Sequence, residues 1–139
     1  MYRLLVIAEE DDMRQLLESE LRKVNQGTHI ESAHDRLSLE ERLQEKHGYD
    51  LHIVYGTQTK QHGKLEPLWM WAGQYFQTTF GSTASLLLAS ENSKVIDQGL
   101  GMGMGIFRLT SREIENRDLG LLVTYIRRLL PQHHSRRRE

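Results

Sequence analysis

The chain has 139 residues and no cysteine, so disulfides, thiolate metal sites and cysteine nucleophiles are excluded. Its formal charge of −1 is uneven, because residues 127–139 hold five arginines against one glutamate, a net +4 that leaves −5 for the rest. This length predicts one domain, and the absence of a leader or of an apolar run of about 18 residues predicts a soluble protein of the cytoplasm without a membrane segment.

The first segment is an apolar run, residues 4–7, which is followed by four consecutive carboxylates. These are Glu9, Glu10, Asp11 and Asp12, and an amphipathic run that predicts a helix begins at Met13. A buried strand that leads into a helix ends at the carboxyl edge of a parallel sheet, where α/β proteins bind ligands. Acids at this edge suggest a divalent cation or a phosphoryl group, and Asp11 or Asp12 could also cap the helix.

The next residues predict two further strands with a helix between them. Residues 28–33 predict a short strand, and Ser38 with Glu41 predicts a capping box for a helix that ends near Lys46. Residues 51–55 are apolar and rich in β-branched side chains, which is typical of a buried strand. A polar loop, residues 57–63, comes after it.

Pro67 marks the start of a third helix, whose apolar side chains recur at helical spacing. Trp71 and Tyr75 lie outside that apolar stripe. They either form an interaction hot spot or cover the loop that precedes the helix. The sequence leaves both interpretations open.

The last third of the chain predicts a strand at residues 85–89, a brief helix from Ser93, a strand at 106–109 and a helix from about Asn116 to near Pro131. Glycines at 99, 101, 103 and 105 predict a mobile connector with Met102 and Met104 lightly packed, because they lack the spacing of a dinucleotide loop. Residues 132–139 are expected to form a basic tail or linker. Such a tail can bind nucleic acid or acidic partners. The rest of the chain has no basic patch, so nucleic-acid binding by the domain itself is not expected.

Strands that alternate with helices imply a parallel sheet covered on both faces. We therefore expect residues 1–131 to form one doubly wound (βα)5 domain of the flavodoxin-like class, with strand order 2-1-3-4-5. This order would bring the ends of the first, third, fourth and fifth strands together.

Three segments carry a resemblance to a known family: residues 4–10, residues 13–17 and residues 48–54. Through them the chain resembles the CheY-like receiver domain of bacterial response regulators. Such domains accept a phosphoryl group on an aspartate that ends the third strand. They hold magnesium with acids that end the first strand, and they sense the phosphate with a hydroxyl and a lysine that end the fourth and fifth.

The resemblance places other residues at these positions. Ala8 and Glu9 match the acidic pair, or Glu9 and Glu10 after a shift of one residue, and Tyr55 matches the phosphoacceptor. The remaining matches are Ala89 with Ser90 one step on for the hydroxyl, Arg108 and Leu109 at the lysine, and Thr110 at the proline that follows it. A neutral phenol forms no acyl phosphate. The resemblance therefore implies a pseudo-receiver, with Glu9 and Glu10 as candidate cation ligands and no cofactor.

The function expected from the sequence is non-catalytic signalling through a protein partner. The candidate contact residues are Trp71, Tyr75, Ile106 and Tyr125, and the resemblance implies a homodimer face at residues 93–100, 106–109 and 116–130. An alternative is the binding of a small molecule or nucleotide at the carboxyl edge. The seven histidines have no metal-ligand spacing, and His52 is interpreted as a core or sheet residue.

Overall fold

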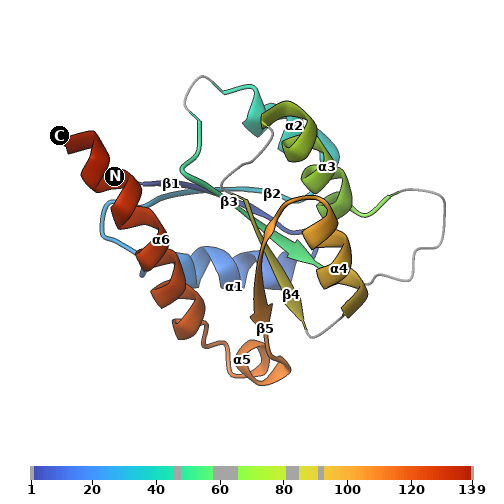
Figure 1. Cartoon of the computed structure of the whole chain (residues 1–139). Helices are drawn as coiled ribbons and strands as arrows, with labels where there is room; N and C mark the ends of the chain where they lie inside the picture. The colour runs from blue at the N-terminus through green and yellow to red at the C-terminus, as the bar shows by residue number, and fades with distance from the viewer. Residues whose placement is uncertain (1, 46–47, 58–65, 81–84, 91–92, 139) are drawn as a thin grey trace.

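Five parallel strands form one sheet in the computed structural model, which describes residues 2–45, 48–57, 66–80, 85–90 and 93–138. The strands are β1 (Arg3–Ile7), β2 (His29–Ala33), β3 (Leu51–Gly56), β4 (Ser85–Ser90) and β5 (Gly105–Leu109). Their spatial order is β2-β1-β3-β4-β5, which confirms the predicted doubly wound topology (Figure 1). β2 and β5 are the edge strands.

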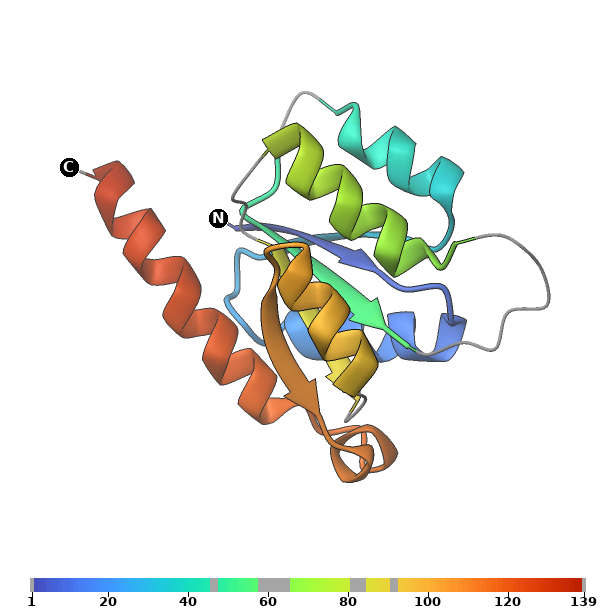
Figure 2. The ribbon, with the colours of Figure 1, turned by 45° about the vertical axis from the view of Figure 1, so that its right-hand side comes forward.

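Helices cover both faces of the sheet, as Figures 1 and 2 show. They are α1 (Asp11–Leu21), α2 (Arg36–Leu43), α3 (Leu68–Phe80), α4 (Ser93–Gly101), α5 (Ser111–Glu115) and α6 (Gly120–Arg138). The apolar faces of α1 and α6 form one core with the sheet, and those of α2, α3 and α4 form a second core on its other face. No helix in the described part of the chain is long and apolar enough to cross a membrane.

Side chains of β3 alternate between the two cores, as the pleat of a strand requires. Leu51, Ile53 and the half-buried Tyr55 pack on the side of α1 and α6, whereas Val54 belongs to the core under α3. The register pairs Tyr55 with Leu88 of β4. Tyr55 thus reaches the carboxyl edge on the α1 side of the sheet.

The predicted capping box of the second helix was wrong by three residues. Asp35 is the N-cap of α2, and its side chain accepts a hydrogen bond from the Ser38 backbone N–H at 2.8 Å, while the Ser38 hydroxyl accepts one from Asp35 N–H. An aspartate before the first turn satisfies the free N–H groups better than a serine within it can. α2 ends at Leu43, and Lys46 lies outside the described residues.

Both ends of the predicted final helix were wrong. A short helix, α5, and a turn that contains Arg117 at φ 52° intervene before α6 starts at Gly120. α6 then continues through Pro131 to Arg138. A proline removes one backbone hydrogen bond from a helix interior, but the preceding turns already provide the costly helix nucleus, so propagation can continue past it.

The glycine-rich segment lies largely within regular elements rather than in a separate connector. Gly99 and Gly101 belong to α4, Gly103 adopts the turn conformation with φ 76°, and Gly105 begins β5. Met104 is 4% exposed and belongs to the core under α3, so the prediction that it is lightly packed was wrong. The loop predicted at 57–63 lies outside the described residues after Thr57.

Candidate functional site

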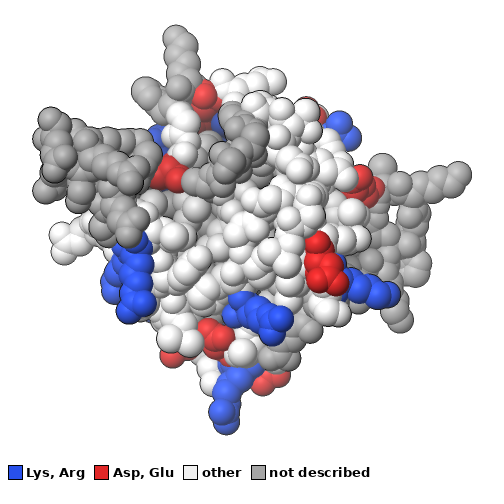
Figure 3. Space-filling view, in the orientation of Figure 1, with Lys and Arg blue, Asp and Glu red and all other residues white. Residues whose placement is uncertain are grey.

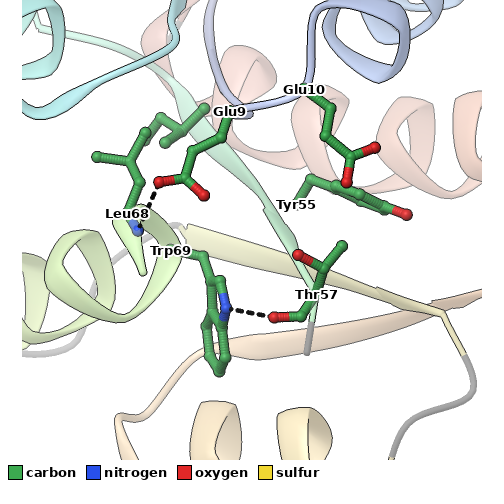
Figure 4. A pocket seen from close by; sticks show the side chains of 7 residues that line it. Glu9, Glu10, Tyr55, Thr57, Leu68 and Trp69 are labelled. Carbon is green, nitrogen blue, oxygen red and sulfur yellow. Dashed lines mark hydrogen bonds between the residues drawn. The ribbon is translucent and has the colours of Figure 1, made fainter. Parts of the chain in front are cut away.

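The ends of β1 and β3 meet the start of α3 at the carboxyl edge of the sheet. A small cavity there is lined by Ile7, Glu9, Glu10, Tyr55, Thr57, Leu68 and Trp69 (Figure 4). These residues come from segments that are distant in sequence and adjacent only through the sheet order. The cavity is where a receiver-like site would lie.

Glu9 is committed to the start of α3. Its Oε1 accepts a hydrogen bond from the Leu68 backbone N–H at 3.2 Å, a contact that Figure 4 shows as a dashed line. The first turn of α3 contains no acidic residue of its own. Glu9 therefore supplies, from the segment between β1 and α1, the anion that a helix N-terminus favours.

The next two aspartates have basic neighbours rather than an open ligand position. Asp11 Oδ1 accepts a hydrogen bond from Arg14 Nη2 at 2.6 Å within α1. Asp12 Oδ1 lies 3.6 Å from Arg117 Nη1, an ion pair that joins α1 to the turn before α6. Both side chains are exposed, so these pairs stabilise the fold only weakly. The acid cluster is thus dispersed over α3, α1 and the α5–α6 turn.

Tyr55 lies beside the remaining acid, Glu10, as Figure 4 shows. Burial raises the pKa of the Tyr55 phenol, the negative charge of Glu10 raises it further, and a hydrogen bond with the Ser90 hydroxyl opposes both effects. The phenol is therefore neutral near pH 7. A neutral phenol cannot form an acyl phosphate and is a poor ligand for magnesium.

The ends of β4 and β5 place the other predicted site residues on different sides. Ala89 is fully buried in the core under α3 and α4, so the hydroxyl that reaches Tyr55 is that of Ser90. Leu109 pairs with Ser90 in the register and is fully buried in the core of α1 and α6. Arg108 is exposed and lines a separate groove beside α4. No amine occupies the position of the family's lysine.

The cavity at Tyr55 has room for about one water molecule, at about 10 Å³. Trp69 closes one wall, because its indole Nε1 donates to the Thr57 carbonyl at 3.0 Å. Within the described residues no group of three or more His, Asp or Glu side chains is arranged to hold a metal ion. The cavity formed by the described residues is therefore small, and it has no preformed set of metal ligands.

Trp71 and Tyr75 pack between α3 and α2. The two rings stack with centroids 5.3 Å apart, and the Arg36 guanidinium of α2 lies 4.7 Å from the centre of the Trp71 ring. Both side chains are half-buried. Their evident structural role is to hold α2, which has one buried side chain, Leu39, against α3.

Ile106 and Tyr125 lie on opposite flanks of the edge strand β5. Ile106 packs on the α4 side, whereas the Tyr125 ring of α6 contacts Phe107 with centroids 5.3 Å apart. Three apolar side chains of α6 are exposed at intervals of four residues: Leu121 at 70%, Tyr125 at 36% and Leu129 at 40%. Figure 3 shows an uncharged area over the upper part of β5, between α6 and α4.

Two buried titratable side chains, His52 and Glu20, contribute to packing and hydrogen bonding within the fold. His52 is 8% exposed and stacks on Phe76 at 4.2 Å between centroids, and burial lowers its pKa to about 4. Glu20, which was not predicted from the sequence, is 5% exposed, and its carboxylate accepts hydrogen bonds from Leu119 N–H and Lys23 Nζ. Its partner Leu119 lies 99 residues away in sequence, so no local pattern indicates its role.

Comparisons with known proteins support the fold. No family model and no curated protein sequence matches the chain. Among solved structures, it is similar to the receiver domain of a DNA-binding response regulator from Colwellia psychrerythraea, with a TM-score of 0.69, 11% identity and coverage of 94% of this chain and 98% of the other.

Two further structures extend this likeness. A response regulator receiver domain from Rhodospirillum rubrum has a TM-score of 0.60 and 12% identity, over 91% of this chain and 89% of the other. A putative pilus assembly protein from Burkholderia thailandensis has a TM-score of 0.58 and 16% identity, over 84% of this chain and 93% of the other. The chain thus has the CheY-like receiver fold.

Proposed function

We propose that the protein is a phosphorylation-independent receiver-like domain that acts in bacterial signalling in the cytoplasm through protein contacts. The observation that carries this proposal is Tyr55, a neutral and half-buried phenol at the position matched to the phosphoacceptor. Leu109 at the lysine position and the Glu9–Leu68 hydrogen bond support it. The domain is accordingly non-catalytic and needs no cofactor.

A titration with magnesium and beryllofluoride, an analogue of a phosphoryl group, tests the lack of phosphorylation. Trp69 lies against the cavity and serves as a fluorescent reporter. We expect no saturable change for the wild-type chain. The variant Tyr55→Asp restores a carboxylate at the position matched to the phosphoacceptor and is the matched comparison. Saturable binding of beryllofluoride by the wild-type chain would contradict the proposal.

The surface proposed for protein contact is the face of α4, β5 and α6, and the partner we propose first is a second copy of the chain. The exposed stripe of Leu121, Tyr125 and Leu129 supports it, because apolar side chains gathered on one helix face indicate an interaction site. Sedimentation velocity over a range of protein concentrations measures the self-association. We expect Leu121→Glu with Leu129→Glu to weaken it by at least about tenfold.

Leu37→Glu is the control for this experiment. Leu37 is 72% exposed, similar to Leu121, but it lies on α2, which packs beside β2 at the opposite edge of the sheet from β5. A weakening by Leu37→Glu equal to that of the α6 variant would contradict the proposed face. A wild-type chain that stays monomeric at high concentration would contradict the homodimer. In that case the partner that binds this face would be a different protein.

A further inference from the structure

A groove lies between the start of α4 and the end of β5. Its lining residues are Ser93, Ile96, Arg108 and Thr110, and its volume of about 490 Å³ is in the range of small-molecule sites. α4 packs against β5, and Figure 2 shows the start of α4 near the arrowhead of β5. The groove is thus at the carboxyl edge of the sheet, where open α/β folds bind ligands.

The lining of the groove combines one cation with hydroxyls and an aliphatic wall. Arg108 supplies the guanidinium, Ser93 and Thr110 supply hydroxyls, and Ile96 forms the apolar part. None of these four residues is acidic. The Thr110 hydroxyl already bonds with Glu113, donating to its Oε1 at 3.0 Å and accepting from its N–H at 3.1 Å. Ser93 and Arg108 therefore remain as the donors for a ligand.

Arg108 differs from most other arginines of the domain. Those at positions 3, 14, 36, 42 and 117 pair with carboxylates. Arg127 instead donates to the carbonyls of Lys23 and Val24, just after α1. No carboxylate among the described residues pairs with Arg108, although the chain outside residues 127–139 carries a net charge of −5. A guanidinium without a carboxylate, beside a cavity, can bind an added anion.

We propose that this groove binds a small anion through Arg108, with a phosphate or a carboxylate as the recognised group. The planar guanidinium matches the oxygens of either group with two parallel hydrogen bonds. Ser93 adds a third donor, and Ile96 contacts the carbon body of the ligand. The groove lies on the face of α4, β5 and α6 that is proposed above for protein contact, but the proposal rests on neither Tyr55 nor the exposed stripe of α6.

Nuclear magnetic resonance of the full chain tests the site, with inorganic phosphate, phenyl phosphate and benzoate titrated at constant ionic strength. Saturable shifts of the amide signals near residues 93–96 and 108–110 are expected with at least one probe. Phenyl phosphate and benzoate share an aromatic ring, so their relative affinities separate the phosphate from the carboxylate. Arg108→Gln is expected to weaken binding by at least about tenfold, because a hydrogen bond to a charged group contributes about 1.5 kcal/mol or more.

Matched variants make the result specific. Arg108→Lys keeps the charge but loses the planar pair of donors, so it should bind with intermediate affinity. Arg128→Gln removes another exposed arginine, on α6, and should leave the affinity unchanged. Retained affinity in Arg108→Gln, equal losses in both glutamine variants, or shifts that never saturate would each overturn the proposal. If Arg108→Gln unfolds, Arg108→Lys and Ser93→Ala provide the same comparison in a folded chain.

Discussion

At the scale of single residues, the four acids after β1 illustrate how position decides what a carboxylate does. Glu9 is bonded to the start of α3, Asp11 and Asp12 pair with arginines, and Glu10 stays beside a phenol. A magnesium site needs several of these oxygens directed at one point. Their separate partners explain why an acidic run in the sequence does not amount to a metal site in the fold.

Replacement of Glu9 by alanine should destabilise the domain by about 1 kcal/mol, because the Leu68 N–H loses its acceptor and the first turn of α3, which has no acid of its own, loses a nearby negative charge. Glu9→Gln keeps an acceptor and should lose about half as much. Urea unfolding measures both. Glu41→Gln, at an exposed position of α2, is the control, and a Glu9→Ala chain as stable as this control would contradict the capping role.

Protonation of His52 should lower stability in acid. Its folded pKa of about 4 lies below the usual value of 6.5, so between these pH values the unfolded chain binds more protons. The free energy of unfolding should therefore fall as the pH drops from about 6.5 to about 4, by roughly 3 kcal/mol, and His52 adds no further slope below that. Above pH 6.5 its contribution is fully present.

The measurement compares urea unfolding of the wild-type chain and His52→Phe at pH 7 and pH 4.5. Phenylalanine retains a ring to stack on Phe76 but cannot be protonated. We expect the wild-type chain to lose more stability between the two pH values than the variant does. His34→Gln, at an exposed position, should follow the wild type. Parallel curves for wild type and His52→Phe would show that His52 is not the source.

At the scale of elements, periodicity predicted most of the structure. Each apolar run became a strand, and the rules for parallel strands led to the observed order. The errors fell where two local signals competed. Asp35 and Ser38 both resemble caps, and the capping box of Thr110 and Glu113 starts a helix of five residues, which is too short for periodicity to reveal.

The site was less predictable than the fold, because its contacts are not local. The sequence resemblance was sufficient to match Tyr55 and Leu109 to the ends of the third and fifth strands. The Glu9–Leu68 bond, in contrast, spans 59 residues, and nothing in either segment indicates it. The groove of Arg108 likewise depends on the spacing between α4 and β5, which packing determines.

That spacing depends on Gly99 of α4. A Cβ at this position would lie 2.9 Å from Ile106 Cδ1 and still closer to a methyl group of Leu87, whereas a Cβ at Gly101 of the same helix meets nothing within 4 Å. Gly99→Ala should therefore destabilise the domain by about 1–3 kcal/mol through overpacking. Gly101→Ala should be neutral or stabilise it by up to about 1 kcal/mol. Equal effects in urea unfolding would contradict this account of α4.

A buried carboxylate, that of Glu20 in α1, holds the start of α6 through a hydrogen bond with Leu119 N–H. Glu20→Ala would leave the buried Leu119 N–H without an acceptor and should cost about 1–3 kcal/mol. Glu20→Gln keeps an acceptor there and should cost less. Hydrogen exchange locates the effect, which should appear first at the start of α6. An effect that begins in α3, on the other side of the sheet, would contradict it.

At the scale of the whole molecule, the question is where the domain ends, because α6 extends beyond its last described core residue. Leu130 is 3% exposed and packs in the core of α1 and α6, whereas its neighbour Leu129 is exposed. The helix continues to Arg138 through a proline that interrupts its hydrogen bonds. The stability of the fold should therefore depend on the chain up to Leu130 and little on the residues after it.

Two truncated chains test this boundary. A chain of residues 1–131 should unfold within about 0.5 kcal/mol of the full chain, because it keeps the whole described core. A chain of residues 1–128 loses Leu130 and should be less stable by about 2 kcal/mol or more, the value of one buried leucine. A large loss already in the 1–131 chain would instead mean that the arginine-rich end stabilises the domain. In that case its net positive charge would be acting on the acidic body, and the loss would shrink in high salt.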